Sequence, residues 1–496
     1  MSVCHHCHAS FRARLQSGWY RHCHLRRPYT RPTFAPRPAP NLKHIRQNPG
    51  LYEQNCNDRH HAAYARNGWR ILELHEQLVA RQKESAELRQ RNNAIGKEMK
   101  DSAARKGDGT SALIAEAKML KAALSDFEKS EKATHEEMER LALELPNLSS
   151  LHTPVGDSPE VLGYINGQEP PEKAAQASHV DIGRELNLLD FEASATTTGW
   201  GWYFLKNEAA LLEQALIQFA LSVALKRGWQ IMTPPSLVYG HIASACGFMP
   251  RDQHGETQIY HIGSQEADES KGSLVLAGTA EIPFAGSQAN KIISDHDLPM
   301  KVVGPSRCYR AEAGARGVDT KGLYRVHEFT KVEMFAWAKP PGDADGGDRF
   351  GTEDAASQAE ELFEEMVDLQ REILSALNLH ARILEMPTAD LGASATRKID
   401  IEAYIPSRTA LDKGYGEVTS ASICTDYQAR RLNTRVKSAD GRNTFAHTVN
   451  GTAMAVPRVL AAILENGWDE GSREVVVPAC LRRWMPGEMS VIGRRG

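Results

Sequence analysis

Apolar residues between positions 69 and 145 repeat with the seven-residue spacing of a coiled coil. The first half of this seam comprises Ile71, Leu74, Leu78, Leu88, Ile95 and Met99, with interruptions at Arg81, Ser85 and Asn92. After the stretch KGDGTS at 106–111, the seam resumes at Leu113, Leu120, Leu124, Phe127, Met138, Leu141 and Leu145. Two helices of about 35 residues would each extend about 50 Å. The pattern therefore predicts two long helices that fold back as an antiparallel coiled coil.

Charge is unevenly distributed along this coiled coil. The part near the turn carries basic residues against fewer acids, namely Arg89, Arg91, Lys97, Lys100, Arg105, Lys106, Lys118 and Lys121. Residues 128–144, at the opposite end, are mainly acidic. A basic tip suits contact with nucleic-acid phosphates. A dimerisation coiled coil with a solvated charged face explains the periodicity equally well.

The pattern changes beyond Pro146, which ends the second helix because proline lacks an amide donor. Residues 146–178 are rich in Gly, Pro and Glu and are predicted to form a linker. A helix at 211–227 and a strand at 230–232 follow, and then short strands with hairpin signals, interrupted by a helix at 355–377. This order predicts an α+β fold with a mixed, mostly antiparallel sheet flanked by helices. The acidic, Gly-rich stretch 340–355 is predicted to be a surface loop.

Residues 307–335 contain the strongest candidate chemistry, on what we expect to be a hairpin with a long Gly-rich loop at its middle. Arg310 and Glu312 are two residues apart, so on an extended strand their side chains would share one face. Residues 326–333 alternate again and place Phe329 and Glu333 on one face of a returning strand. An arginine, two glutamates and an aromatic ring gathered on one sheet face suit a bound zwitterion and a nucleotide. A surface hairpin with cross-strand ion pairs is the alternative.

Four sequence blocks make the resemblance to a known family specific. The segments RCYRAEAG and GLYRVHEFTKVEMF resemble motif 2 of class II aminoacyl-tRNA synthetases, and their sequence is similar to that of the seryl-tRNA synthetases in particular. The other blocks are GTAEIP at 278–283, EVTSASICTDYQARR at 417–431 and HTVNGTAMAVPR at 447–458. They keep the family's order, and the resemblance runs from about residue 42 to the C-terminus. The helix, strand and proline pair at 211–235 resemble motif 1, the dimer-forming element.

The resemblance implies an ATP site that requires Mg²⁺. The residues matched to it are Arg310, Ala311, Glu312, Phe329, Glu417, Val418, Thr419, Ser420 and Arg458. Arg310 and Arg458 are the implied catalytic residues, at the α-phosphate and the γ-phosphate respectively. Glu312 and Phe329 would hold the adenine, and Glu417 with Ser420 would meet the magnesium ion, a hard cation that prefers oxygen ligands.

The resemblance also implies a pocket for L-serine. The matched residues are Thr279, Ala280, Glu281, Glu333 and Thr452. A pocket built to bond a hydroxyl rejects an analogue that lacks it. Glu328 stands where glutamine is usual, and Thr452 where serine is usual. No zinc-binding insertion is apparent, so zinc is not expected. We assign no role to His327, Cys308, Arg430 or Arg431.

The composition of the chain bears on its location in the cell. The chain has 496 residues, a net charge of -4 and no apolar run long enough to suggest a membrane span. Its eight cysteines form no obvious framework, so reduced thiols are expected. No acid precedes Glu53, whereas arginines recur from Arg12 onwards, a composition typical of a mitochondrial presequence. A basic nucleic-acid-binding arm is one alternative for this segment, and a zinc site around CHHCH at 4–8 is another.

These observations predict three segments: a presequence at 1–40, a tRNA-binding helical arm with its linker at 41–165, and a class II catalytic domain at 166–496. The expected function is ATP-dependent activation of L-serine and its transfer to tRNA(Ser) by a homodimer in the mitochondrial matrix. A non-catalytic synthetase paralogue that binds RNA is the main alternative. A ligase that loads an amino acid onto a carrier protein is a third, but such a ligase would lack the arm.

Overall fold

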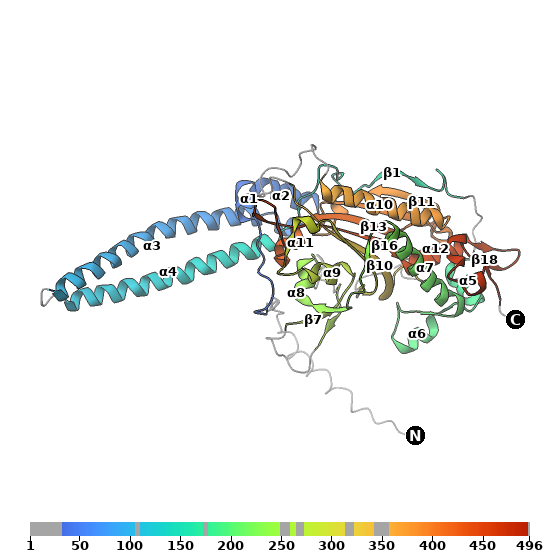
Figure 1. Ribbon diagram of the computed structural model, residues 1–496, viewed down its shortest axis with the longest axis horizontal. Coiled ribbons are helices and arrows are strands. Elements are labelled where there is room, and N and C mark those ends of the chain that lie inside the picture. Colours follow the sequence, from blue (N-terminus) through green and yellow to red (C-terminus); the bar gives the residue numbers. More distant parts are fainter. Residues whose placement is uncertain are drawn as a thin grey trace, which may run out of the picture.

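The computed structural model describes residues 32–104, 110–171, 177–248, 258–263, 272–312, 322–341 and 357–494. A long two-helix arm extends from one side of a body built on a central sheet (Figure 1). The predicted Gly-rich loop of the 307–335 hairpin and the predicted loop at 340–355 lie largely outside the described residues, as does most of the predicted presequence.

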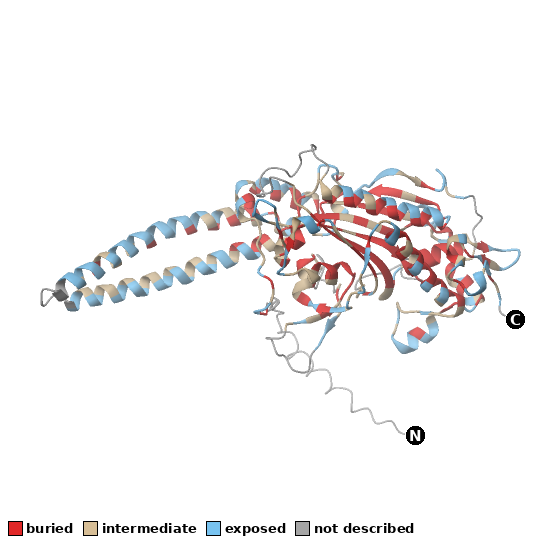
Figure 2. Ribbon diagram, viewed as in Figure 1, coloured by how far each residue is buried: buried red, intermediate tan, exposed pale blue. Residues whose placement is uncertain are grey.

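The arm confirms the predicted antiparallel coiled coil. Its long helices are α3 (Asn67–Ala104) and α4 (Thr110–Glu144), and α1 (Leu42–Gln47) and α2 (Pro49–Asp58) pack at their base. The apolar core of the arm lies at this base, where residues such as Ile71, Leu74 and Met138 are buried. Farther out most side chains are exposed (Figure 2). Ser85, which interrupts the seam, is fully buried and donates its hydroxyl to a carbonyl of its own helix.

An eight-stranded sheet forms the body, in the order β1-β11-β12-β13-β16-β10-β9-β4. Neighbouring strands are antiparallel except for the parallel pair β4 and β9, which confirms the predicted mostly antiparallel sheet. In sheet order the strands are Glu160–Ile165, Ala381–Glu385, Arg397–Tyr404, Tyr415–Thr425, His447–Ala455, Glu328–Ala338, Met300–Tyr309 and Gln230–Ile231.

Helices cover both faces of this sheet because its central strands alternate between two apolar cores. Val332 and Met334 of β10 belong to the core formed with α7 (Asn207–Lys226), α10 (Gln358–Ala376) and α12 (Val456–Asn466). Phe335 and Trp337 belong to the opposite core. The helices of that second core are α8 (Gly240–Ala245), α9 (Glu281–Ser287) and α11 (Tyr427–Leu432).

Smaller elements surround the sheet. The described residues contain three further three-stranded sheets and a two-stranded sheet of β2 (Leu189–Asp190) and β3 (Phe204–Leu205). The three-stranded sheets consist of β5 (Leu237–Tyr239), β7 (Leu274–Leu276) and β6 (His261–Ile262); of β15 (Asn443–Phe445), β14 (Arg435–Lys437) and β8 (Ile292–Ser294); and of β17 (Trp468–Asp469), β18 (Glu474–Val476) and β19 (Val491–Ile492). The remaining elements include α5 (His179–Glu185), α6 (Phe191–Thr197) and α13 (Ala479–Arg482).

The helix α7 is the only one among the described residues that is long and apolar enough to cross a membrane. Its apolar window is 67% buried, and side chains along its length, such as Leu212, Leu216 and Ala220, have no exposed surface. The helix therefore packs as a core helix of this body.

The structure adds detail to two of the predicted segments. The predicted linker contains β1, which pairs with β11 and forms one edge of the main sheet. Its Gly and Glu content concealed the strand, because an edge strand can leave Val161 and Leu162 exposed. Residues 32–40, included in the predicted presequence, lie against the body: Phe34 packs on Tyr239 with ring centroids 5.2 Å apart, and the Ala39 amide donates to the Arg430 carbonyl.

Candidate active site

One cleft collects most of the residues predicted from the sequence. It lies between the β9–β10 hairpin, β13, the end of β16 and the start of α12. The residues that line it are Arg310, Glu312, Tyr324, Arg325, Val326, Phe329, Lys331, Glu417, Val418, Thr419, Ser420, Thr452, Ala455, Pro457 and Arg458. Segments far apart in the sequence therefore meet at a single charged cavity.

The hairpin supplies one end of this cleft. The Arg310 guanidinium lies 5.3 Å from the centre of the Phe329 ring, and the Arg310 amide donates to the His327 carbonyl. The prediction that an extended strand carries Arg310 and Glu312 on one face was wrong, because β9 ends at Tyr309 and Glu312 has a left-handed φ of 46°. Glu312 nevertheless lines the same cleft, where its carboxylate accepts a 2.6 Å bond from Arg325.

The opposite end is organised by Arg458, in the first turn of α12. Its Nη1 donates to the Glu417 carbonyl at 2.9 Å and to the Glu417 carboxylate at 3.0 Å. Its Nε donates to the Tyr324 carbonyl at 3.0 Å. Removal from water acts to raise the pKa of Glu417, but the charges of Arg458 and Lys398 outweigh this effect and lower the pKa to about 2. The Glu417 side chain is therefore an ionised carboxylate at neutral pH.

The other residues of the 417–420 stretch are held by β13. Val418 is buried in the apolar core, and the Thr419 hydroxyl donates to the Thr452 carbonyl. Ser420 lines the cleft and is paired in register with Asp400 of β12. Ala311 continues from Arg310, and its amide donates to the Gln258 carbonyl. The strand thus fixes Glu417 and Ser420 along one wall.

Residues predicted to bind L-serine form a buried polar cluster centred on Lys331, which itself lines the cleft together with Thr452. The Lys331 ammonium lies 2.5 Å from the Glu333 carboxylate and donates to the Thr279 hydroxyl at 2.8 Å. Thr452 donates to the same Glu333 carboxylate at 3.4 Å. Ala280, fully buried, precedes α9. The cluster therefore joins the 278–283 loop, β10 and β16.

Glu281, in the first turn of α9, completes this cluster. Its two oxygens accept from Gln428 at 2.6 Å and from Asn450 at 3.3 Å. Burial, reinforced by the nearby Glu333 charge, raises the pKa of Glu281 to about 8. Burial also raises the pKa of Glu333, although the Lys331 charge opposes this. At neutral pH the Glu281 carboxyl is mostly protonated.

Five residues of the site had been given no role from the sequence, namely Tyr324, Arg325, Lys331, Gln428 and Asn450. The sequence did contain a signal for Lys331, because it lies between Phe329 and Glu333 at two-residue spacing and so shares their face of β10. The other four depend on contacts between distant segments. His327, also without an assigned role, packs its ring near Trp200 and Trp202.

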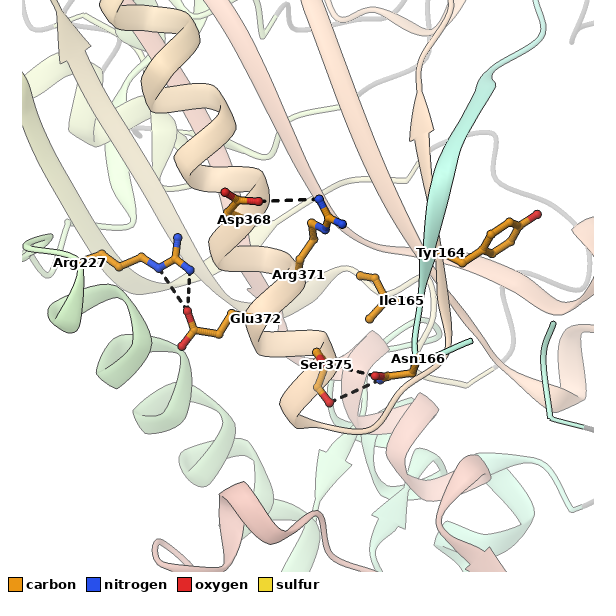
Figure 3. A pocket seen from close by; sticks show the side chains of 8 residues that line it. All are labelled: Tyr164, Ile165, Asn166, Arg227, Asp368, Arg371, Glu372 and Ser375. Carbon is orange, nitrogen blue, oxygen red and sulfur yellow. Dashed lines mark hydrogen bonds and ion pairs between the residues drawn. The ribbon is translucent and has the colours of Figure 1, made fainter. Parts of the chain in front are cut away.

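A second cleft lies between β1, α10 and the end of α7 (Figure 3). It is lined by Tyr164, Ile165, Asn166, Arg227, Asp368, Arg371, Glu372 and Ser375. Its arginines are paired with acids, Arg227 with Glu372 at 2.6 Å and Arg371 with Asp368 at 3.8 Å. None of the residues predicted from the sequence lines it, so the catalytic candidate is the first cleft.

Comparison with known proteins agrees with this architecture. Residues 260–467 match the tRNA synthetase class II core domain (G, H, P, S and T), so the body is a class II synthetase core. Residues 41–149 match the seryl-tRNA synthetase N-terminal domain. The chain therefore belongs to the seryl-tRNA synthetases, the class II enzymes that ligate serine to tRNA.

Individual relatives support the same family. The chain is 43% identical to the mitochondrial serine–tRNA ligase of Saccharomyces cerevisiae over 69% of its own length and 72% of the relative's. It is 37% identical to the serine–tRNA ligase of Rubrobacter xylanophilus over 92% of this chain and 100% of that one. A crystal structure of seryl-tRNA synthetase from Pyrococcus horikoshii complexed with ATP has a TM-score of 0.81, at 29% identity, and covers 92% of this chain and 100% of its own.

Proposed function

We propose that this serine–tRNA ligase is a homodimer that charges tRNA(Ser) for translation in the mitochondrial matrix. The observation that carries the catalytic proposal is the convergence of Arg310, Glu417 and Arg458 on one cleft. The address rests on the Arg-rich, acid-free N-terminal composition and on similarity to a mitochondrial relative.

In the first step, the serine carboxylate attacks the α-phosphorus of ATP and pyrophosphate leaves. No general base is required, because the carboxylate is already ionised at neutral pH. Arg310 neutralises charge between the two reactants, while Phe329 and Glu312 hold the adenine. Arg458 binds the γ-phosphate end. In the second step, a ribose hydroxyl of the tRNA attacks the carbonyl of the adenylate and AMP leaves.

ATP binding requires rearrangement of two ion pairs. The Glu312 carboxylate is bonded to Arg325, and Arg458 is bonded to Glu417. Adenine and phosphate groups would replace these partners and release both acids for their proposed roles. Because Glu312 and Arg458 are only 12% and 21% accessible, the exchange depends on ATP supplying replacement partners as the two pairs separate.

The donor chemistry of the cleft suits magnesium bound together with ATP. Glu417 is ionised, and Ser420 adds a hydroxyl oxygen on the same wall. The described residues contain no group of three or more His, Cys, Asp or Glu side chains that could hold a metal by itself. An ion held mainly by phosphate oxygens with one or two protein ligands matches the usual Mg²⁺ site. Such an ion would neutralise phosphate charge in the first step.

Serine selection is assigned to the buried cluster. Thr279, Glu281, Glu333 and Thr452 offer polar groups for the ammonium and hydroxyl of serine. Alanine would leave the hydroxyl-directed groups unpaired in a site from which water is excluded, which is the basis of strong rejection.

The arm and the motif 1 region support the two proposed macromolecular contacts. Exposed basic residues near the arm's end, including Arg89, Lys97 and Lys118, suit tRNA phosphates. Arg91 differs, because it is paired with Glu98 and Glu116. On α7 and β4, apolar Leu225 and Ile231 are about half exposed, as expected of a face that a second copy would cover.

One assay tests the enzymatic core of the proposal: amino-acid-dependent exchange of pyrophosphate into ATP, run over all twenty amino acids. We expect exchange with serine alone, followed by charging of mitochondrial tRNA(Ser). Exchange with another amino acid would refute the substrate. Exchange with no amino acid would favour the non-catalytic RNA-binding paralogue.

A further inference from the structure

The junction between the arm and the catalytic body is mainly polar. The buried apolar residues of the arm base form a cluster of their own, drawn entirely from positions 45–148. The two cores of the body contain none of these residues. Within the part of the chain that the structure describes, the angle of the arm therefore depends on hydrogen bonds across the junction.

Arg59, at the end of α2, makes three of these hydrogen bonds although it is only 1% exposed, and a fourth bond joins it to Asn147 on the arm side. Its Nη1 donates to the carbonyls of Asn147 at 2.5 Å and Ala395 at 2.9 Å. Its Nη2 donates to the carbonyls of Gly392 at 2.5 Å and Leu391 at 3.4 Å. Burial lowers the pKa of Arg59 to about 10, so the guanidinium stays charged at neutral pH. A buried charge held by carbonyl dipoles is compensated only while those carbonyls keep their positions.

Asn147, which follows α4, makes hydrogen bonds to the same loop of the body, residues 391–396. Its amide nitrogen donates to the Ala393 carbonyl at 2.9 Å, and its side chain donates to the carbonyls of Ser394 and Cys424, both at 2.9 Å. Cys424 belongs to β13, the strand that carries Glu417 and Ser420 into the active-site cleft. The arm base is thus bonded directly to a strand of the catalytic wall.

We propose that Arg59, Asn147 and the loop 391–396 form an interdomain clamp that sets the angle of the arm for aminoacylation. Arg59 and Asn147 are positioning residues in this proposal, which rests on the proposed tRNA-binding role of the arm. The lever is long: α4 has 35 residues, or about 52 Å, so a tilt of about 10° at its base moves its far end by about 9 Å. Displacements of this size would carry a tRNA held by the arm away from the cleft.

The test compares two substitutions of the same type. Arg59→Met removes the charge and the four bonds while keeping a long apolar side chain. Arg140→Met removes an arginine at the same end of the arm whose ion pairs, with Glu137 and Glu144, stay within α4. For Arg59→Met we expect serine-dependent pyrophosphate exchange within about twofold of the original and a kcat/KM for tRNA charging lower by about tenfold or more. Arg140→Met should change neither.

Small-angle X-ray scattering of the folded variants is sensitive to the arm angle, which a loss of stability alone would not change. The scattering curve of Arg59→Met should depart from that of the original protein, because the arm samples other angles, whereas that of Arg140→Met should superimpose. Asn147→Ala, which breaks the other half of the clamp, should repeat the Arg59→Met result. Charging by both clamp variants at the original rate, equal loss of exchange and charging, or unchanged scattering would each overturn the proposal.

Deletion of residues 86–124 separates this idea from the proposed function. If that deletion abolishes tRNA charging while Arg59→Met does not, the clamp is refuted and the arm's role stands. If the deletion leaves charging intact, the arm is not the tRNA-binding element, and both proposals fail.

Discussion

Replacing Glu281 with glutamine should change how the stability of the catalytic body depends on pH. In the folded protein, burial and the nearby Glu333 charge raise the pKa of Glu281 from its ordinary value of 4.5 to about 8. Between pH 4.5 and about pH 8, the Glu281 carboxyl therefore holds a proton in the folded state and has lost it in the unfolded state. The unfolding free energy therefore falls as the pH rises through this window.

The magnitude follows from the size of this pKa difference. Each pH unit within the window costs about 1.36 kcal/mol, so the whole window amounts to about 5 kcal/mol. Glutamine is neutral at every pH and does not contribute this slope. It keeps an oxygen for the 2.6 Å bond from Gln428 but presents an amide to Asn450, whose bond is the longer one at 3.3 Å. That loss is an offset of about 1 kcal/mol that does not vary with pH.

The assay is urea unfolding followed by tryptophan fluorescence at pH 6 and at pH 9. Relative to Glu281→Gln, the original protein should lose about 3 kcal/mol of unfolding free energy between these conditions. Glu361→Gln, on the exposed face of α10, is the matched control and should show the slope of the original protein. A difference between Glu281→Gln and the original protein that is the same at both pH values would refute the assignment of a protonated carboxyl at position 281.

Four other predictions concern activity and cellular location. Arg310→Ala should lower serine-dependent pyrophosphate exchange by about 100-fold or more while the protein stays folded, and near-normal exchange would reject its proposed role at the α-phosphate. Deleting residues 86–124 should spare exchange but abolish tRNA charging, and tRNA binding to the intact protein should weaken steeply with salt, as measured by filter binding. Residues 1–45 fused to a fluorescent reporter should direct it to mitochondria, and a diffuse cytosolic signal would contradict this. N-terminal sequencing of the mature protein should place cleavage before Phe34, because that ring packs on the body.

Local periodicity predicted the arm and the central hairpin well. The heptad seam places apolar residues between α3 and α4 because seven-residue spacing follows from helix geometry alone. The alternation along β10 likewise separates two faces, with Val332 in an apolar core and Glu333 in the polar cluster. Where the rule was applied beyond a strand, it failed: Glu312 follows the end of β9, and its backbone turns into the left-handed region.

Partner choice could not be predicted, because it is decided by tertiary contacts. Nothing local indicates that Arg325 binds Glu312, or that Arg59 reaches a carbonyl 336 positions away. Lys331 was overlooked for a different reason. A lysine on a strand is usually solvated, and only burial against Glu333 makes it the centre of a cluster.

The ion pairs in the two regions of the proposed active site differ in how far they are exposed to solvent. In the proposed ATP region, each ion pair has a covered partner, with Glu312 12% and Arg458 21% accessible, so ATP must supply replacement partners for these groups. In the region proposed to bind serine, Lys331 and Glu333 are 8% and 1% accessible, and breaking such a pair costs several kcal/mol. A preorganised cluster of this kind cannot adapt to a wrong amino acid, and it gains discrimination from that rigidity. Under the proposed function, we therefore expect ATP to bind with rearrangement of its ion pairs, and selection of the amino acid to depend on the buried Lys331–Glu333 pair.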